Sequence, residues 1–181
     1  MKAQDNKLLK LIFAGVLAAM VYVVTLFRFP LLGSKVHFAN AVCLLSGMLL
    51  GPLWGGAAAG LGSALYDAFG GGYDFLNVLI TFVSKFAMAW ICGILMRQGM
   101  KKQAQSGPAR TVISSAVGAL TYVALYMLKS LLMYGWAGMA SRFPASIINA
   151  AAAIVAAPVF YHAITPALRS AGILKQMQGE E

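Results

Sequence analysis

Apolar runs long enough to cross a bilayer constrain this chain more than any other feature. Residues 8–27 contain a single charged side chain, Lys10, over about 20 positions. As a helix, this run would cross roughly 30 Å of hydrocarbon. Over the whole chain 60% of the residues are hydrophobic and 10% are charged, which is too apolar for a soluble domain of 181 residues. The sequence therefore predicts an all-α integral membrane protein.

Helix-breaking residues divide the chain into six apolar runs. Pro30 and Gly33 interrupt the chain after the first run, and Pro52 can open a helix but cannot continue one. The expected transmembrane helices cover about residues 8–27, 38–50, 53–69, 74–96, 111–134 and 143–166, within a single domain over residues 1–181. Loops are expected at residues 28–36, 70–73, 97–110 and 135–142. The glycines of the third run predict a buried helix that lies flat against its neighbours.

The basic residues predict how the helices are oriented. The chain carries 14 lysines and arginines and a formal charge of +9. With the N-terminus inside, the cytoplasmic basic residues are Lys2, Lys7, Lys10, Arg97, Lys101, Lys102, Arg110, Arg169 and Lys175, and the outer ones are Arg28, Lys35 and Arg142. The positive-inside rule therefore predicts that both termini are cytoplasmic. These charges lie between the apolar runs and not along one face, which argues against nucleic-acid binding.

Lys85 is the polar residue that hydropathy explains least. A lysine at this depth costs about 3 kcal/mol on insertion scales, so it should face protein, water or a ligand. On the fourth predicted helix, Asn77, Thr81, Ser84 and Lys85 recur at intervals of three and four residues and share one face. Similar stripes on the fifth and sixth helices contain Tyr122, Tyr126, Lys129 and Met133, and Arg142, Ser146 and Asn149. Together the stripes predict one binding pocket that opens to the outside.

The two intramembrane lysines also have structural interpretations. Lys85 lies about 16 Å along the helix from Asp74, too deep for its amine to reach the interface. It would therefore line a pocket or form a buried ion pair with Asp67. Lys129 lies about 8 Å from the outer end of its helix, so it either faces the pocket or snorkels to the interface.

Several other candidate site residues have two interpretations. His37 and Asn40 flank the start of the second helix, where they can cap it or line the pocket. Asn149 can bond to a ligand or across helices, and Asp74 can cap the fourth helix. The glycines of residues 70–72 allow positive φ and predict a turn or a lid, which adds Tyr73 to the candidates.

Small residues on the first helix form a possible contact face. Ala14, Gly15, Ala18 and Ala19 make two overlapping pairs of small residues four positions apart, a pattern that allows close approach of another helix. The spacing alone fits packing within this chain as well as contact with a partner protein.

Three segments carry a family resemblance. The stretches VHFANAVCLLSGMLLGPLWGGAAAGLGSALYDAF, LITFVSKFAMAWICGIL and FPASIINAAAAIVAAP resemble the substrate-binding S component of energy-coupling factor (ECF) transporters, in the riboflavin-type branch. The matching features are the LLGP turn, a glycine-rich helix that ends in an aspartate, a lysine in the fourth helix, and Pro-x-x-x-x-Asn opening the sixth. The resemblance covers about residues 14–158.

The resemblance implies a six-helix subunit that captures a vitamin or related micronutrient outside a prokaryotic-type plasma membrane. Delivery would require a transmembrane T subunit and two ATPases, and the family's Ala-x-x-x-Ala contact with the T subunit carries over onto Ala14 and Ala18. The glycine loop lacks the lysine and hydroxyl of a P-loop, so ATP hydrolysis is expected on the partner subunits and no cofactor on this chain.

One departure from the family pattern concerns the fifth helix. Lys129 stands where many members of the branch carry an acidic or neutral polar residue. With Lys85 and Arg142 nearby, the pocket would be electropositive and would favour a carboxylate, a phosphate or several acceptor oxygens. The identity of the vitamin is left open.

Two other classes of protein fit the sequence less well. A stand-alone secondary transporter of a small organic solute should show inverted repeats and broken helices, and no convincing repeat is found. An intramembrane enzyme would need a nucleophile with a base, or a metal cluster, but the two histidines, His37 and His162, are placed near opposite membrane faces. Cys43 and Cys92 have neither disulfide nor metal spacing and are expected to be packing residues.

Overall fold

Helices account for almost all of the regular structure in the computed structural model, which describes residues 2–31, 34–100 and 107–174. The elements, in chain order, are α1 (Lys2–Leu26), β1 (Phe29–Leu31), β2 (Ser34–Val36), α2 (Ala39–Leu50), α3 (Pro52–Leu65), the π-helical turn η1 (Tyr66–Gly70), α4 (Phe75–Met100) and α5 (Pro108–Ser170). The predicted helical fold class is confirmed.

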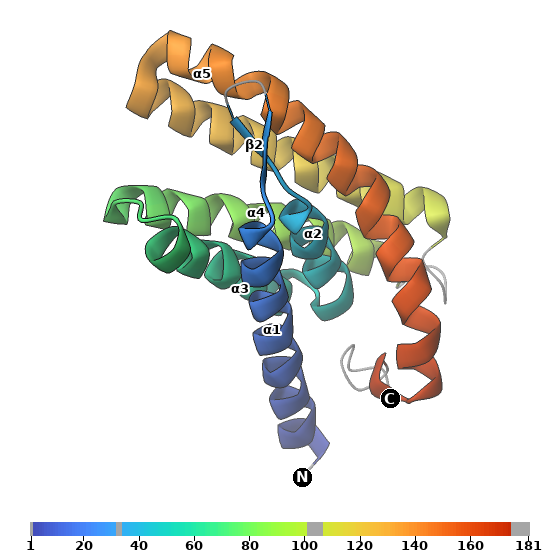
Figure 1. Ribbon diagram of the computed structural model, residues 1–181. Coiled ribbons are helices and arrows are strands. Elements are labelled where there is room, and N and C mark those ends of the chain that lie inside the picture. The colour runs from blue at the N-terminus through green and yellow to red at the C-terminus, as the bar shows by residue number, and fades with distance from the viewer. Residues whose placement is uncertain (1, 32–33, 101–106, 175–181) are drawn as a thin grey trace.

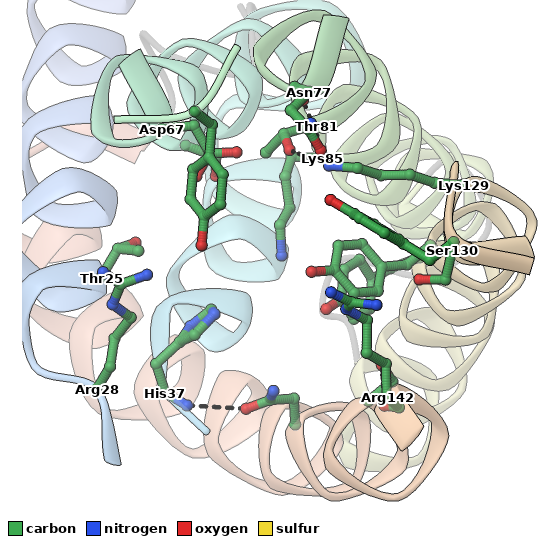
Figure 2. Close-up of a pocket in the computed structure, with 17 residues that line it drawn as sticks. Thr25, Arg28, His37, Asp67, Asn77, Thr81, Lys85, Lys129, Ser130 and Arg142 are labelled. Carbon is green, nitrogen blue, oxygen red and sulfur yellow. Dashed lines mark hydrogen bonds between the residues drawn. The ribbon is translucent and has the colours of Figure 1, made fainter. Parts of the chain in front are cut away.

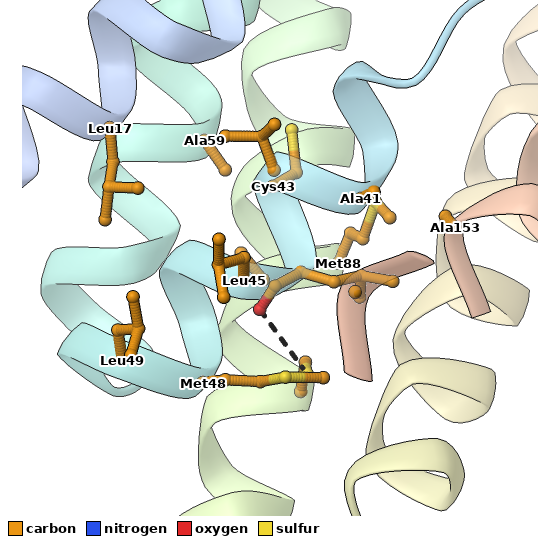
Figure 3. Close-up of a cluster of buried hydrophobic side chains, with 14 of the residues drawn as sticks. Leu17, Ala41, Cys43, Leu45, Met48, Leu49, Ala59, Met88 and Ala153 are labelled. Atoms are coloured by element: carbon orange, nitrogen blue, oxygen red, sulfur yellow. Dashed lines mark hydrogen bonds between the residues drawn. The ribbon is translucent and has the colours of Figure 1, made fainter. Parts of the chain in front are cut away.

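The short helix α2 forms the centre of the structure. All of its 12 residues are buried, and it packs against α1, α3, α4 and α5. Figure 3 shows Leu45 and Met48 of α2 among side chains from each of these helices, including Leu17 of α1 and Ala153 of α5. At 1.5 Å per residue α2 is only about 18 Å long, so its burial depends on the longer helices around it.

The glycine-rich face of α3 brings helix backbones into direct contact. A Cβ atom at Gly55 would collide with the backbone oxygen of Ser46 in α2, and one at Gly62 would collide with the backbone oxygen of Ala18 in α1. The prediction that this helix lies flat against its neighbours is therefore confirmed. A larger side chain at either glycine would push apart helices that carry residues of the cavity described below.

Helix α5 consists of two arms that meet at Gly135. This residue alone has non-helical dihedral angles, φ 67° and ψ −170°, which glycine adopts without steric cost. Figure 1 shows the turn between a yellow arm and an orange-to-red arm. The predicted loop at residues 135–142 is therefore wrong, because one glycine reverses the chain and the residues after it return to helix.

Other boundaries also differ from the predictions. Part of the expected outer loop at residues 28–36 forms an antiparallel pair in which Phe29 faces Val36 and Leu31 faces Ser34. Strands of three residues are too short for their periodicity to be recognised in the sequence. Helix α1 begins at Lys2 instead of about residue 8, and the end of the third predicted helix widens into η1. Much of the predicted linker, residues 101–106, lies outside the described residues.

Three of the described helices are long and apolar enough to span a membrane. They are the segments Asn6–Leu26, Phe75–Gln98 and Pro108–Ser170, of which the last contains both arms of α5. The start of α1 and the end of α5 lie at the same end of the molecule (Figure 1). The count of six membrane spans stays a prediction.

Candidate functional site

A cavity of about 320 Å³ lies between the end of α1 and the walls formed by α3, η1, α4 and α5. Figure 2 shows polar side chains that reach toward its open centre from several elements. Its lining consists of Thr25, Arg28, His37, Ser63, Asp67, Tyr73, Asn77, Thr81, Lys85, Tyr122, Tyr126, Lys129, Ser130, Tyr134, Arg142, Ser146 and Asn149. All of these side chains are polar or aromatic, in contrast to the apolar core beside them.

Lys85 of α4 is almost completely buried, with 6% of its surface exposed. Its Nζ donates a hydrogen bond to Oδ1 of Asn40 in α2 and lies 3.9 Å from the centre of the Tyr122 ring in α5. Both partners are neutral, so they solvate the ammonium group without cancelling its charge. The alternative of a direct ion pair with Asp67 is not realised among the described residues.

Lys129, on the first arm of α5, is also buried, with 7% exposed. Its Nζ donates to the backbone oxygen of Asn77 at 3.4 Å and to Oγ1 of Thr81 at 3.3 Å, and lies 5.5 Å from the centre of the Tyr126 ring. The side chain therefore points across the cavity toward α4 and does not snorkel to an interface. Its direct partners are again neutral.

Two half-buried arginines complete the positive lining. The Arg28 guanidinium, just after α1, lies 4.4 Å from the centre of the Tyr66 ring and donates to the Tyr66 hydroxyl. Arg142, on the second arm of α5, lies 4.0 Å from the Tyr134 ring centre and donates to the backbone oxygen of Gly138 at 3.3 Å. Cation–π contacts of this kind contribute about 0.5–2 kcal/mol, depending on desolvation.

One carboxylate, that of Asp67 in η1, belongs to the cavity lining in the described part of the chain. Four cations and one carboxylate give the lining a formal charge of +3 with His37 neutral. The π-helical turn displaces Asp67 from the regular α-helical position, and such turns occur frequently at functional sites.

His37 directly follows β2 and belongs to the cavity lining. Its backbone N–H donates to Oδ1 of Asn149 at 2.8 Å, while its buried ring Nδ1 has no hydrogen-bond partner in the protein. Burial, together with the charges of Lys85 and Arg28, lowers the pKa of His37 to about 3. The imidazole is therefore neutral at physiological pH and can exchange a hydrogen bond with a molecule in the cavity.

Asp74 precedes α4 outside the cavity lining. Its side chain accepts a hydrogen bond from the Asn77 amide, and this bond lowers the pKa of Asp74. The carboxylate therefore holds the first turn of α4, as expected of a residue at a helix start. Asn77 in turn provides the backbone oxygen that accepts from Lys129.

The structure brings most of the predicted site residues to one cavity. Those in the lining are His37, Asp67, Tyr73, Asn77, Thr81, Lys85, Tyr126, Lys129, Arg142 and Asn149. Asn40 lies behind Lys85 as its acceptor, and Ser84 points elsewhere, because its hydroxyl donates to the Ile80 carbonyl. Contact of these residues with a substrate stays a prediction.

Several lining residues were missed from the sequence. On α5 a four-residue spacing links Tyr122, Tyr126, Ser130 and Tyr134, so Tyr134 and not Met133 continues the stripe. Ser130 lies four residues after Tyr126, so this spacing could have identified it from the sequence. Thr25, Arg28 and Ser63 gave no comparable signal, since Arg28 was interpreted only as a charge that orients the helices.

The small residues of α1 do not share one environment. Ala14 is buried in the core, with 7% exposed, and Ala18 is half-buried beside Gly62. Gly15 and Ala19 are exposed, and a Cβ atom at Gly15 would meet nothing within 4 Å. In the isolated chain Ala14 and Ala18 therefore pack within the protein, and the outward small residues are Gly15 and Ala19.

Chemically, the cavity offers positive charge, neutral hydrogen-bonding groups and aromatic rings. Within the described residues no group of three or more His, Cys, Asp or Glu side chains could hold a metal ion. Cys43 and Cys92 are free and buried in the core. The arrangement is suited to holding an anionic molecule between helices.

Comparisons with known proteins identify the family and the fold of this chain. A family model for "ECF-type riboflavin transporter, S component" matches residues 5–166. A protein of Pyrococcus woesei described as "Uncharacterized protein in gap 3'region" is 28% identical over 139 residues, which cover 76% of this chain and 88% of that protein. A solved structure described as "Structure and mechanism of the S component of a bacterial ECF transporter" matches with a TM-score of 0.69 and 18% identity, covering 88% of this chain and 97% of that one, which shows a shared fold. The chain therefore belongs to the family of ECF-type riboflavin transporter S components.

Proposed function

We propose that this chain is the substrate-capturing subunit of an ECF importer and that it takes up a vitamin or related micronutrient that carries an anionic or acceptor-rich group. The observation that supports this function best is the polar cavity, which is lined by four cationic side chains whose direct partners are neutral. A buried ammonium or guanidinium group without a counter-ion is costly, and an anionic ligand would supply the missing charge.

The chain would act as one transmembrane domain with six spans and both termini in the cytoplasm. The cavity would open to the outside of a prokaryotic-type plasma membrane. Arg28 and Tyr73 belong to its lining, and the segments that carry them, residues 28–31 and 70–73, would close over bound substrate, as lids do in other binding proteins. The chain itself would need no cofactor.

Transport would depend on partner subunits. A T subunit in the membrane and two ATPases would supply ATP hydrolysis, because this chain contains no P-loop motif. The exposed Gly15 and Ala19 face of α1 is the surface that we expect the T subunit to contact, since small residues permit close helix approach.

Co-expression with a T subunit and two ATPases tests this function against a stand-alone secondary transporter. The expected result is a complex that co-purifies and takes up substrate into cells only when the ATPases are active. Uptake by the isolated chain that is driven by an ion gradient, with no association with the other subunits, would contradict the proposal.

A further inference from the structure

The four cations of the cavity come from four different segments. In Figure 2 Lys85 points toward the open centre from above, Lys129 from the right, Arg142 from the lower right and Arg28 from the lower left. The lysines belong to α4 and the first arm of α5, whereas the arginines follow α1 and lie on the second arm of α5. The positive charge is therefore distributed around the space that a ligand would occupy.

The protein partners of these cations solvate them without neutralising them. The acceptors are the amide oxygen of Asn40, the Thr81 hydroxyl, the Tyr66 hydroxyl and two backbone carbonyls. Each cation also lies against a tyrosine ring, at centroid distances of 3.9 to 5.5 Å. Asp67 supplies one negative charge to the lining.

This charge balance distinguishes between classes of anionic ligand. A ligand with one acidic group would leave about two positive charges uncancelled in a partly desolvated cavity, where repulsion between them is much stronger than in water. One acidic group also cannot approach cations on opposite sides at once. A ligand with two separated acidic groups would leave about one positive charge uncancelled and could contact cations on both sides of the cavity.

We propose that the cavity is specific for a small organic dianion whose acidic groups lie at opposite ends of the molecule. One acidic group lies toward Lys85, Lys129 and Arg142, and the other lies toward Arg28 on the opposite side. This inference rests on the proposed function in that it concerns the substrate of the same cavity, and it goes further by stating the number and separation of the charges. A neutral vitamin such as riboflavin would leave a net charge of about +3 in the lining uncancelled.

A series of rigid probes tests the inference on the purified full chain in lipid nanodiscs. Terephthalate, its monoamide and its diamide share one ring and nearly one shape, but carry two, one and no negative charges. Each carboxylate should tighten binding in calorimetry by roughly ten- to a hundredfold, the range for a charge-assisted hydrogen bond. Riboflavin serves as a neutral probe and should bind more weakly than terephthalate.

Variants then show which side chains distinguish the probes. Lys129→Met and Arg142→Met should each reduce the preference for terephthalate over the monoamide by about tenfold or more. The matched control Arg169→Met removes an exposed arginine outside this cavity and should leave the preference unchanged. Melting of each variant without probe identifies any that fail to fold.

The possible outcomes separate this inference from the proposed function. Equal affinity for the three probes, tighter binding of riboflavin, or no binding of terephthalate at millimolar concentration would each overturn the dianion specificity. None of these results would affect co-purification with the T subunit and ATPases. Conversely, the full charge series in a chain that never associates with those subunits would support the dianion site and contradict the importer function.

Discussion

The contact between Lys85 and Asn40 predicts that Asn40→Leu destabilises the native chain but stabilises a Lys85→Met variant. In the native chain Asn40→Leu removes the acceptor of a buried ammonium group, which should cost about 1.5–3 kcal/mol, the range for a hydrogen bond to a charged group. In a Lys85→Met background the ammonium is gone and the Asn40 oxygen is orphaned, at a cost of about 1–3 kcal/mol. Adding Asn40→Leu to the Lys85→Met variant should therefore raise its free energy of unfolding by about 1–3 kcal/mol.

The assay is reversible unfolding of the four proteins of this double-mutant cycle in mixed detergent micelles. Lys85→Met alone should stay folded, because the lost hydrogen bond and ring contact are offset by removal of a desolvated charge, which itself costs several kcal/mol. Asp67→Asn in the Lys85→Met background is the matched control. Recovery by Asp67→Asn instead of Asn40→Leu would show that Lys85 is paired with Asp67 and would refute the reasoning.

Three further predictions concern the partner face, the histidine and the lids. Gly15→Trp should fold normally, because a side chain there meets open space, but should abolish ATP-dependent uptake; Ala14→Trp should destabilise the chain itself by about 1–3 kcal/mol through overpacking. Normal transport by Gly15→Trp would contradict the docking face. The pKa of His37 is about 3 in the fold and about 6.5 when unfolded, so its contribution to stability is present above about pH 6.5 and is lost as pH falls toward 3. His37→Gln should reduce the loss of thermal stability as the pH falls, and an unchanged pH profile would show that another group titrates. Amide hydrogen exchange in residues 29–31 and 70–73 should slow when terephthalate binds, and equal rates would count against lid closure.

The helical periodicity allowed much of the cavity to be predicted from the sequence. Asn77, Thr81 and Lys85 are four residues apart on one helix, and the structure places all three in the lining. A regular helix fixes which side chains share a face, so a polar stripe in an apolar run is informative. The glycine content of the third apolar run separately predicted that α3 lies flat against its neighbours, and the structure confirms this.

Features that depend on tertiary contacts could not be predicted in this way. Arg28 follows the end of α1, where no periodicity shows that its guanidinium turns to Tyr66. Gly135 reverses the chain within a single residue, whereas its sequence context resembled a longer loop. The acceptor of Lys85 is Asn40, which lies 45 positions away in the sequence, and only the packing of α2 against α4 brings them together.

The most direct measurement of the central claim is mass spectrometry of small molecules released from the chain after purification from cells in gentle detergent. The native protein should release a small organic compound with two acidic groups, enriched over a mock preparation. A folded Lys129→Met variant should release much less of it, because Lys129 lies in the cavity with only neutral partners. Release of a neutral compound, in equal amounts from both proteins, would contradict the claim that this cavity captures an anionic substrate.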